Sequence, residues 1–151
     1  QGRDQDGGVI VRAQPPVPGV SPGHVLLVDD EMLILRVARA GLESLGYTVT
    51  VEQSPVTALS LVSLAAEPFD MVVTDINMPE MTGIELAKAI RMIQPAMPIL
   101  VMSGLADREA LDEVQTLGAH FMPKPYTRAE FSLALVEARS AITRLRESLG
   151  E

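Results

Sequence analysis

The sequence contains no cysteine and no tryptophan, and aromatic residues make up only 3% of its 151 residues. The absence of cysteine excludes disulfides and thiolate metal sites, so stability must come from packing. Because hydrophobic residues still amount to 47% of the chain, the core must be aliphatic, as in the buried strands of a parallel sheet. A chain of this length suits one domain that buries roughly two-thirds of its unfolded surface.

Positive charge is also scarce, with 12 Lys and Arg against 20 Asp and Glu and a net charge of -8. This balance argues against direct binding of nucleic acid, which requires clustered cations. No apolar run approaches the roughly 18 residues of a membrane-spanning helix, and the first residues, QGRDQDGG, lack the features of a signal peptide. We therefore expect a cytoplasmic domain that contacts neither nucleic acid nor membrane.

Residues 1–23 are rich in Gly, Pro, Gln and Asp and end in the run QPPVPGVSPG. This composition predicts a flexible linker, followed by one folded domain over residues 24–149. The short apolar stretch at residues 9–11 is either the end of a preceding strand or part of the linker. The chain opens on Gln rather than Met, so we expect it to be a piece of a longer protein.

From His24 onward, short aliphatic runs alternate with segments of helical periodicity, which is typical of successive βα units. The pattern predicts an α/β fold, with five helices around a doubly wound, five-stranded parallel sheet. The expected strands are 24–28, 47–51, 69–74, 99–102 and 120–122.

The expected helices begin at recognisable capping residues. They are Ser54 with Pro55, Thr82 with Glu85, Asp107, and Thr127 with Glu130. In the first helix the predicted core face is Ile34, Val37, Ala38, Gly41, Leu42 and Leu45. In the last it is Phe131, Ala134, Leu135, Ala138, Ile142, Leu145 and Leu149, with Arg139, Arg144, Arg146 and Glu147 in solvent.

Four of the five expected strands end in reactive polar residues: Asp29 with Asp30, Asp75, Ser103 and Lys124. Each residue alone has an ordinary structural explanation, such as a helix cap or a turn. Together they lie where doubly wound sheets bind ligands, beyond the carboxyl ends of the strands. We therefore expect these side chains to form one site.

Three carboxylates at one edge repel one another unless a proton or a hard cation intervenes. Mg²⁺, or Mn²⁺ in its place, prefers oxygen ligands and keeps waters that a phosphate can replace. Beside such an ion, the Asp75 carboxylate can attack phosphorus, while Lys124 and the Ser103 hydroxyl hold the oxygens of the transferred group. The expected product is an aspartyl phosphate.

The strings VLLVDDE, VVTDINMPEMTG, ILVMSG and GAHFMPKPY, in this order, resemble the receiver domain of response regulators over about residues 24–145. The resemblance implies a flavodoxin-like sheet of order 2-1-3-4-5. It makes Asp75 the phosphoacceptor and Asp30 a direct metal ligand. Asp29 would act through a metal-bound water, and Asn77 would add its backbone carbonyl.

The same resemblance implies a conformational switch and a partner. Ser103 matches the switch hydroxyl, Phe121 the switch aromatic and Lys124 the phosphate-binding cation, and Pro125 implies a cis peptide bond after the lysine. We expect Ser103 to move inward on phosphorylation, Phe121 to turn into the vacated space, and the surface of the fourth helix, fifth strand and fifth helix to change. The phosphoryl donor would be a histidine kinase or a phosphotransfer domain.

Alternatives remain at this stage. The chain can be a pseudo-receiver that serves only as a docking module, although no acidic motif residue is missing. An aspartate-based phosphohydrolase of the haloacid dehalogenase type is disfavoured because Asp75 is followed by INMP and no cap domain fits. The parent protein can be a hybrid histidine kinase, which the linker favours, or a single-domain regulator.

Some remaining residues have less specific interpretations. His24 and His120 have no second ligand nearby in the sequence and are expected in strands. Tyr126 is expected to pack under the last helix. Met78 and Met81 follow Asp75 and are candidates for a docking surface.

Overall fold

The structure is a computed structural model that describes residues 22–64, 68–105 and 107–150. Strands and helices alternate along the described chain. The strands are β1 His24–Val28, β2 Thr48–Glu52, β3 Met71–Asp75, β4 Ile99–Ser103 and β5 His120–Pro123. The helices are α1 Met32–Ser44, α2 Pro55–Leu64, α3 Gly83–Ile93, α4 Arg108–Thr116 and α5 Arg128–Ser148. The expected linker, including residues 9–11, lies almost entirely outside the described residues.

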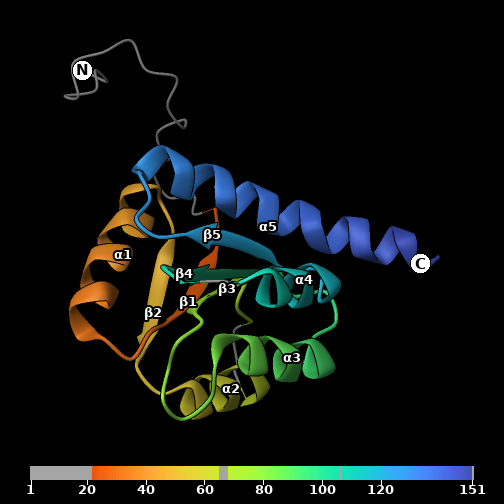
Figure 1. The fold of residues 1–151 in the computed structure, drawn as a ribbon. Coiled ribbons are helices and arrows are strands. Elements are labelled where there is room, and N and C mark those ends of the chain that lie inside the picture. Colours follow the sequence, from red (N-terminus) through yellow and green to blue (C-terminus); the bar gives the residue numbers. More distant parts are fainter. Residues whose placement is uncertain (1–21, 65–67, 106, 151) are drawn as a thin grey trace.

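The five strands form one parallel sheet in the order β2-β1-β3-β4-β5, which confirms the predicted fold and strand order. Helices α1 and α5 cover one face of the sheet, and α2, α3 and α4 cover the other (Figure 1). The chain moves from β1 outward to β2 and then back past β1 to β3. The ends of β1 and β3 therefore flank the point at which the winding reverses, where such sheets bind ligands.

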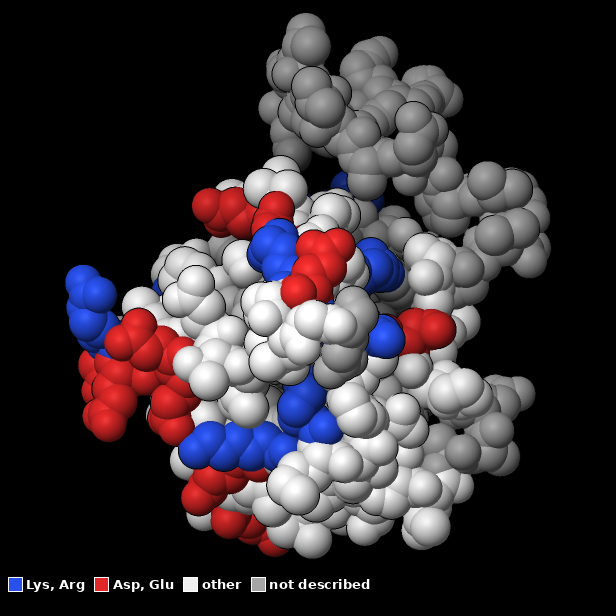
Figure 2. Space-filling view, turned by 90° about the vertical axis from the view of Figure 1, so that its right-hand side faces the viewer, with Lys and Arg blue, Asp and Glu red and all other residues white. Residues whose placement is uncertain are grey.

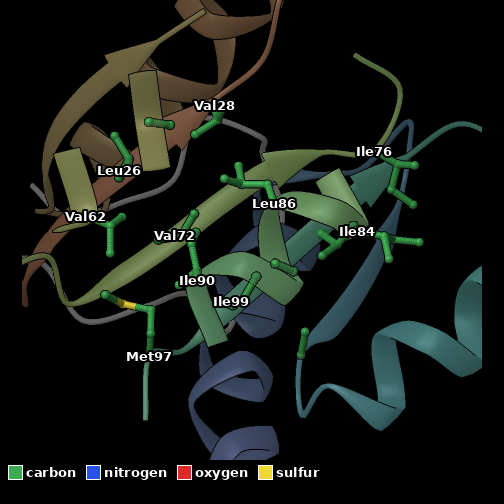
Figure 3. Close-up of a cluster of buried hydrophobic side chains, with 14 of the residues drawn as sticks. Leu26, Val28, Val62, Val72, Ile76, Ile84, Leu86, Ile90, Met97 and Ile99 are labelled. Carbon is green, nitrogen blue, oxygen red and sulfur yellow. The ribbon is translucent and has the colours of Figure 1, made fainter. Parts of the chain in front are cut away.

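The central strands β1, β3 and β4 carry the aliphatic core. Alternate residues of β1 point to opposite faces, so Val25 and Leu27 pack with α1 and α5, whereas Leu26 and Val28 pack with α2 and α3. Figure 3 shows the second of these clusters, which includes Leu26, Val28, Val72, Leu86 and Ile90. The sheet is thus buried on both faces, as the aliphatic composition predicts.

The predicted helix caps are present. Both expected capping boxes form, at the starts of α3 and α5. The Asp107 carboxylate accepts a hydrogen bond of 2.8 Å from the Ala110 N–H, and the Ser54 hydroxyl accepts one of 3.2 Å from the Thr57 N–H. Within the described residues, no helix is both long and apolar enough to cross a bilayer.

The guanidinium of Arg91 joins three parts of the chain. It donates hydrogen bonds to the carbonyls of Leu117 after α4 (2.9 Å), Met97 before β4 (2.7 Å) and Pro95 after α3 (3.1 Å). Burial lowers the pKa of this guanidinium, but it remains charged because the ordinary pKa of arginine is far above neutrality. Arg91 thereby fixes the C-terminal end of α4 to the start of β4.

Several side-chain predictions were wrong. Val37 is 69% exposed, and Leu35 takes its place in the core. The helix starts at Met32 and its buried face is centred on Leu35, Ala38 and Leu42, so the phase of the apolar pattern was misjudged. Leu149 is 65% exposed because the described end of α5 extends beyond the sheet (Figure 1).

Two further side chains differ from expectation. Arg139 does not point freely into solvent; it donates a 2.6 Å hydrogen bond to the Tyr47 hydroxyl and lies 5.5 Å from the centre of that ring. Met78 is buried between the helices of the α2 and α3 face, so it belongs to the core and not to a docking surface. Met81 is partly buried against the same cluster.

Candidate functional site

Three carboxylates meet at the carboxyl ends of β1 and β3. Val28 pairs with Thr74 in the sheet, so Asp29 and Asp75 follow at the same level. One oxygen each of Asp29, Asp30 and Asp75 lies within 4.8 Å of the others. Because Asp29 and Asp75 are buried, water screens their repulsion poorly.

Lys124 brings a positive charge to these carboxylates. Its Nζ lies 2.7 Å from Asp75 Oδ1 and 3.5 Å from Asp29 Oδ2. The Lys124 backbone N–H donates to the Ser103 carbonyl, which continues the pairing of β4 with β5. The peptide bond between Lys124 and Pro125 is cis, as predicted.

Backbone groups hold two of the carboxylates in place. Asp29 Oδ1 accepts a hydrogen bond of 2.9 Å from the Glu31 N–H, and Asp75 Oδ2 accepts one of 3.0 Å from the Asn77 N–H. Asp29 Oδ2, in contrast, is buried and accepts no hydrogen bond. The Lys124 ammonium, at 3.5 Å, is close enough for an ion pair with this oxygen but is not hydrogen-bonded to it. A buried carboxylate oxygen without a hydrogen bond is costly, and a bound cation, or a water held by one, would satisfy it.

The charges of the site shift the pKa values of two groups. Burial raises the pKa of Asp29, and the neighbouring negative charges of Asp75 and Asp30 raise it further, against the Glu31 N–H and Lys124, which lower it. Burial alone would lower the pKa of Lys124, but the hydrogen bond and charge of Asp75 and the charge of Asp29 outweigh it and raise that pKa. The site holds three carboxylates and one ammonium, which pairs with two of them, so the donor set suits a hard divalent cation.

Ser103 ends β4 beside Asp75 and is fully buried. Its hydroxyl donates to the Leu105 carbonyl at 2.8 Å and accepts from the Leu105 N–H at 2.9 Å. The Asn77 side-chain amide reaches the same oxygen at 3.3 Å. The hydroxyl is therefore near the carboxylates but engaged in a local turn.

Phe121 lies in β5, paired with Val101 of β4. Its side chain is partly buried against the cluster that includes Val114 of α4. A groove of about 530 Å³ lies beside it, between α4, β5 and α5. Phe121 thus lines a surface groove, on the strand that leads to Lys124.

The sequence reasoning missed the contribution of the turn after β2. The Gln53 side-chain amide donates a 3.1 Å hydrogen bond to the Asp30 carbonyl. The Ser54 hydroxyl donates a 2.9 Å hydrogen bond to Glu80 in the loop after β3. No spacing or motif in the sequence signals these contacts, because they join residues of separate loops.

Gly83 was also missed. A Cβ at this position would lie 2.0 Å from the Asp75 carbonyl oxygen, and the Gly83 N–H donates a 2.8 Å hydrogen bond to the Ile76 carbonyl. The start of α3 therefore lies directly against the backbone of Asp75. A glycine in the first turn of a helix, where it is a poor helix former, was the available signal.

The expected positions of the two histidines and of Tyr126 agree with the structure. His24 lies in β1 and His120 in β5. Among the described residues, the one group of His, Asp and Glu side chains close enough to hold a metal is Asp29, Asp30 and Asp75. Tyr126 packs against Phe131 of α5, with ring centres 5.0 Å apart.

Known proteins resemble this chain. The family described as response regulator receiver domain matches residues 25–136. The transcriptional regulatory protein ZraR of Klebsiella oxytoca is 35% identical over 125 residues, covering 82% of this chain and 28% of that protein. The chemotaxis protein CheY of Pseudomonas aeruginosa is 36% identical over 106 residues, covering 68% of this chain and 85% of that protein.

Solved structures agree with this likeness. The chemotaxis protein CheY4 of Vibrio cholerae superimposes with a TM-score of 0.69 at 31% identity, covering 76% of this chain and 97% of that one. The chain spans only 28% of the length of the ZraR relative. The shared region is most of a small chemotaxis protein but only one part of a larger regulator.

Proposed function

Because the chain belongs to the response regulator receiver domain family of two-component signalling, we propose that it is a phosphoacceptor switch whose phosphorylated residue is Asp75. The phosphoryl donor would be a phosphohistidine of a histidine kinase or phosphotransfer domain. We assign the receiver unit to residues 24–149, with residues 1–23 as a linker. The observation that carries the proposal is the contact of the Asp75 carboxylate with Lys124, at 2.7 Å, within a cluster of three carboxylates.

The chemistry requires a carboxylate nucleophile and a means of stabilising the transferred oxygens. An oxygen of Asp75 forms the new bond to phosphorus while the bond from phosphorus to the histidine nitrogen breaks and its electron pair stays with the imidazole. Lys124, which pairs with Asp75 before transfer, is placed to bind an oxygen of the arriving group. Ser103 is near enough to bind a second one after it leaves Leu105.

The residues present fit a divalent metal. Asp29, Asp30 and Asp75 would hold Mg²⁺ or Mn²⁺ with the Asn77 backbone carbonyl, and the buried Asp29 Oδ2, which accepts no hydrogen bond, supports this assignment. When bound, the ion would neutralise negative charge at the site and help an anionic phosphoryl group approach. The resemblance to receiver domains implies that Asp30, the most accessible of the three carboxylates, would be a direct ligand, with Asp29 acting through a metal-bound water.

The switch would begin at Ser103. An aspartyl phosphate adds negative oxygens beside its hydroxyl, which would exchange both hydrogen bonds with Leu105 for one with the phosphate. Phe121 would then turn inward, and the groove between α4, β5 and α5 would change shape. Partners would recognise that surface.

The partners are expected to be proteins. On the face shown in Figure 2, Lys and Arg side chains lie next to acidic ones and form no continuous basic patch. Among the described residues, Lys88 pairs with Glu113 at 2.8 Å and Arg144 with Glu137 at 3.7 Å. The start of α1 offers a different surface near the site, since Met32 and Leu33 are 46% and 72% exposed, and the phosphoryl donor would dock there.

The proposal is tested by incubating the protein with acetyl phosphate and MgCl₂ and measuring phosphate incorporation by mass spectrometry. Wild-type protein should gain one phosphoryl group that hydroxylamine removes, and Asp75→Asn should gain none. Asp112→Asn, on the exposed face of α4, is the matched control and should label normally. Undiminished labelling of Asp75→Asn would overturn the assignment, and an unlabelled wild type would indicate a docking module without phosphotransfer.

A further inference from the structure

The turn between β2 and α2 contacts both loops that carry the candidate site. Gln53 donates to the Asp30 carbonyl at 3.1 Å, in the loop after β1. Ser54 donates to Glu80 at 2.9 Å, in the loop after β3. Although β2 is the edge strand and lies on the far side of β1 from β3, its turn thus bridges the two acidic loops.

The turn is itself well anchored, so it can restrain what it touches. The Ser54 hydroxyl accepts from the Thr57 N–H at 3.2 Å, and the Ser54 N–H donates to the Glu52 carboxylate at 3.1 Å. The Glu52 carbonyl accepts from the Asp29 N–H at 3.2 Å. Gln53 therefore projects from a segment fixed on both sides, and its amide holds the Asp30 peptide from a defined position.

The position of the Asp30 peptide determines where its carboxylate lies. Asp30 immediately precedes Glu31, whose N–H orients Asp29 Oδ1 at 2.9 Å. A peptide fixed between these two contacts keeps both carboxylates directed toward Asp75. Groups that orient metal ligands without touching the metal commonly affect affinity about tenfold or more.

We infer that Gln53 is a positioning residue for the divalent cation site, acting by holding the Asp30 backbone through its side-chain amide. The inference rests on the proposed function, because it assumes that Asp30 is a metal ligand. Gln53 itself does not contact the reacting atoms. Removal of the Gln53 amide should leave the fold intact, since the side chain is exposed. The loop after β1 would then be less restrained, and cation binding would have to order it.

The experiment is a MgCl₂ titration of folded protein without any phosphoryl donor, followed by the amide resonances of Glu31 and Asn77. Gln53→Met keeps the length of the side chain and removes the donor, and it should weaken Mg²⁺ binding by about tenfold. Gln53→Asn keeps the amide but shortens its reach, and it should also weaken binding. Gln94→Met, an exposed glutamine at the end of α3, is the matched control and should bind as the wild type does.

A second measurement separates positioning from general damage. The rate of labelling by acetyl phosphate in Gln53→Met should fall at limiting Mg²⁺ and return to the wild-type rate at saturating Mg²⁺, with no change in the melting temperature of the metal-free protein. Equal Mg²⁺ affinity of Gln53→Met and wild type would overturn the inference. So would a rate that stays low at saturation, or a lowered melting temperature that accounts for the weaker binding.

The outcomes also distinguish this inference from the function on which it rests. A wild type that binds no Mg²⁺ and gains no phosphoryl group would refute the proposed function and the inference together. A wild type that binds and labels, beside a Gln53→Met variant that binds equally well, would refute the inference alone.

Discussion

Lys124 Nζ and Asp75 Oδ1 lie 2.7 Å apart although 49 residues separate them in the chain. The contact forms because β3 and β5 both flank β4 in a parallel sheet and end at the same edge. Under the proposed function, a phosphoryl group on Asp75 would change this pairing, because the lysine would then lie against the new oxygens. The same ammonium would therefore bind Asp75 before phosphorylation and the phosphoryl group after it.

Lys124→Met should weaken both folding and phosphorylation. The substitution leaves three carboxylates without their cation, so the free energy of unfolding without metal should fall by about 1–3 kcal/mol, less than for a fully buried pair because Lys124 is partly exposed. Labelling by acetyl phosphate should slow by at least about tenfold. Urea denaturation in EDTA and the rate of labelling measure the two effects.

The double variant provides the control for this pair. In the Lys124→Met background, Asp75→Asn should recover part of the lost stability, because it removes the unpaired carboxylate. If the two single losses of stability simply added, the contact would contribute nothing to folding.

The stability that Lys124 contributes should also depend on pH. It is present below the unfolded pKa of the lysine and is lost as the pH rises through its raised native pKa. The difference in the free energy of unfolding between wild type and Lys124→Met should therefore shrink at alkaline pH.

Asp29→Asn should stabilise the metal-free protein at pH 7. The pKa of Asp29 is raised in the native state, chiefly by burial, so folding favours its protonated form. Its contribution to stability is present below the unfolded value of 3.8 and is lost as the pH rises through the native value. The expected gain is about 0.5–2 kcal/mol, measured by urea denaturation in EDTA.

The metal should reverse this order. Mg²⁺ stabilises a protein that binds it, by an amount that grows with the logarithm of the affinity, so added MgCl₂ should raise the melting temperature of the wild type more than that of Asp29→Asn. If Asp29→Asn were less stable than wild type in EDTA, burial and the neighbouring negative charges would not destabilise the ionised Asp29 carboxylate as we expect.

Gly83→Ala should be strongly destabilising. The new methyl group would lie 2.0 Å from the Asp75 carbonyl oxygen, so α3 or the end of β3 must shift, at an expected cost of about 2–4 kcal/mol. Gly104→Ala is the matched control, since a Cβ there meets nothing within 4 Å; it should be neutral within about 0.5 kcal/mol. Thermal denaturation of both variants checks the contrast, and equal stabilities would contradict the close approach.

Ser103→Ala should separate phosphorylation from the response to it. The variant keeps Asp75, Lys124 and the acidic cluster, so beryllofluoride with Mg²⁺ should still bind. It lacks the hydroxyl that would give up its hydrogen bonds to Leu105 and bind the phosphate mimic instead. The amide resonances of β5 and α5 should therefore change much less than in the wild type. Ser103→Thr retains the hydroxyl and should restore the change, whereas a full change in Ser103→Ala would exclude the hydroxyl as the switch.

The sequence pattern was sufficient to predict the parallel sheet and the convergence of Asp29, Asp30, Asp75 and Lys124, whereas the strand order came from the resemblance to receiver domains. Buried parallel strands are continuous aliphatic runs, and their ends must meet at one edge, so polar residues placed there are informative without coordinates. The capping boxes were equally predictable because they depend on residues three positions apart. Strand limits, however, shifted by up to two residues, since apolar strands blend into their flanking turns.

Contacts between separate loops could not be predicted. Gln53 and Ser54 reach Asp30 and Glu80 in separate loops, and no periodicity constrains such pairs. The orientation of Met78 failed for a related reason: a loop residue has no helical or strand period that reveals its face. The exposure of Val37 was not predicted because a short amphipathic pattern does not define closely which side of the helix faces the core.

The hydrogen bonds of Arg91 to the carbonyls of Leu117 and Met97 have a mechanical consequence for α4. They hold the C-terminal end of α4 against the start of β4. The N-terminal end of α4, at Asp107, instead follows the turn in which Ser103 is hydrogen-bonded to Leu105. If α4 moves, we therefore expect its end at Leu117 to stay in place and its start at Asp107 to move furthest. When α4 moves, hydrogen exchange should therefore accelerate first at the Ala110 amide and last at the Leu117 amide.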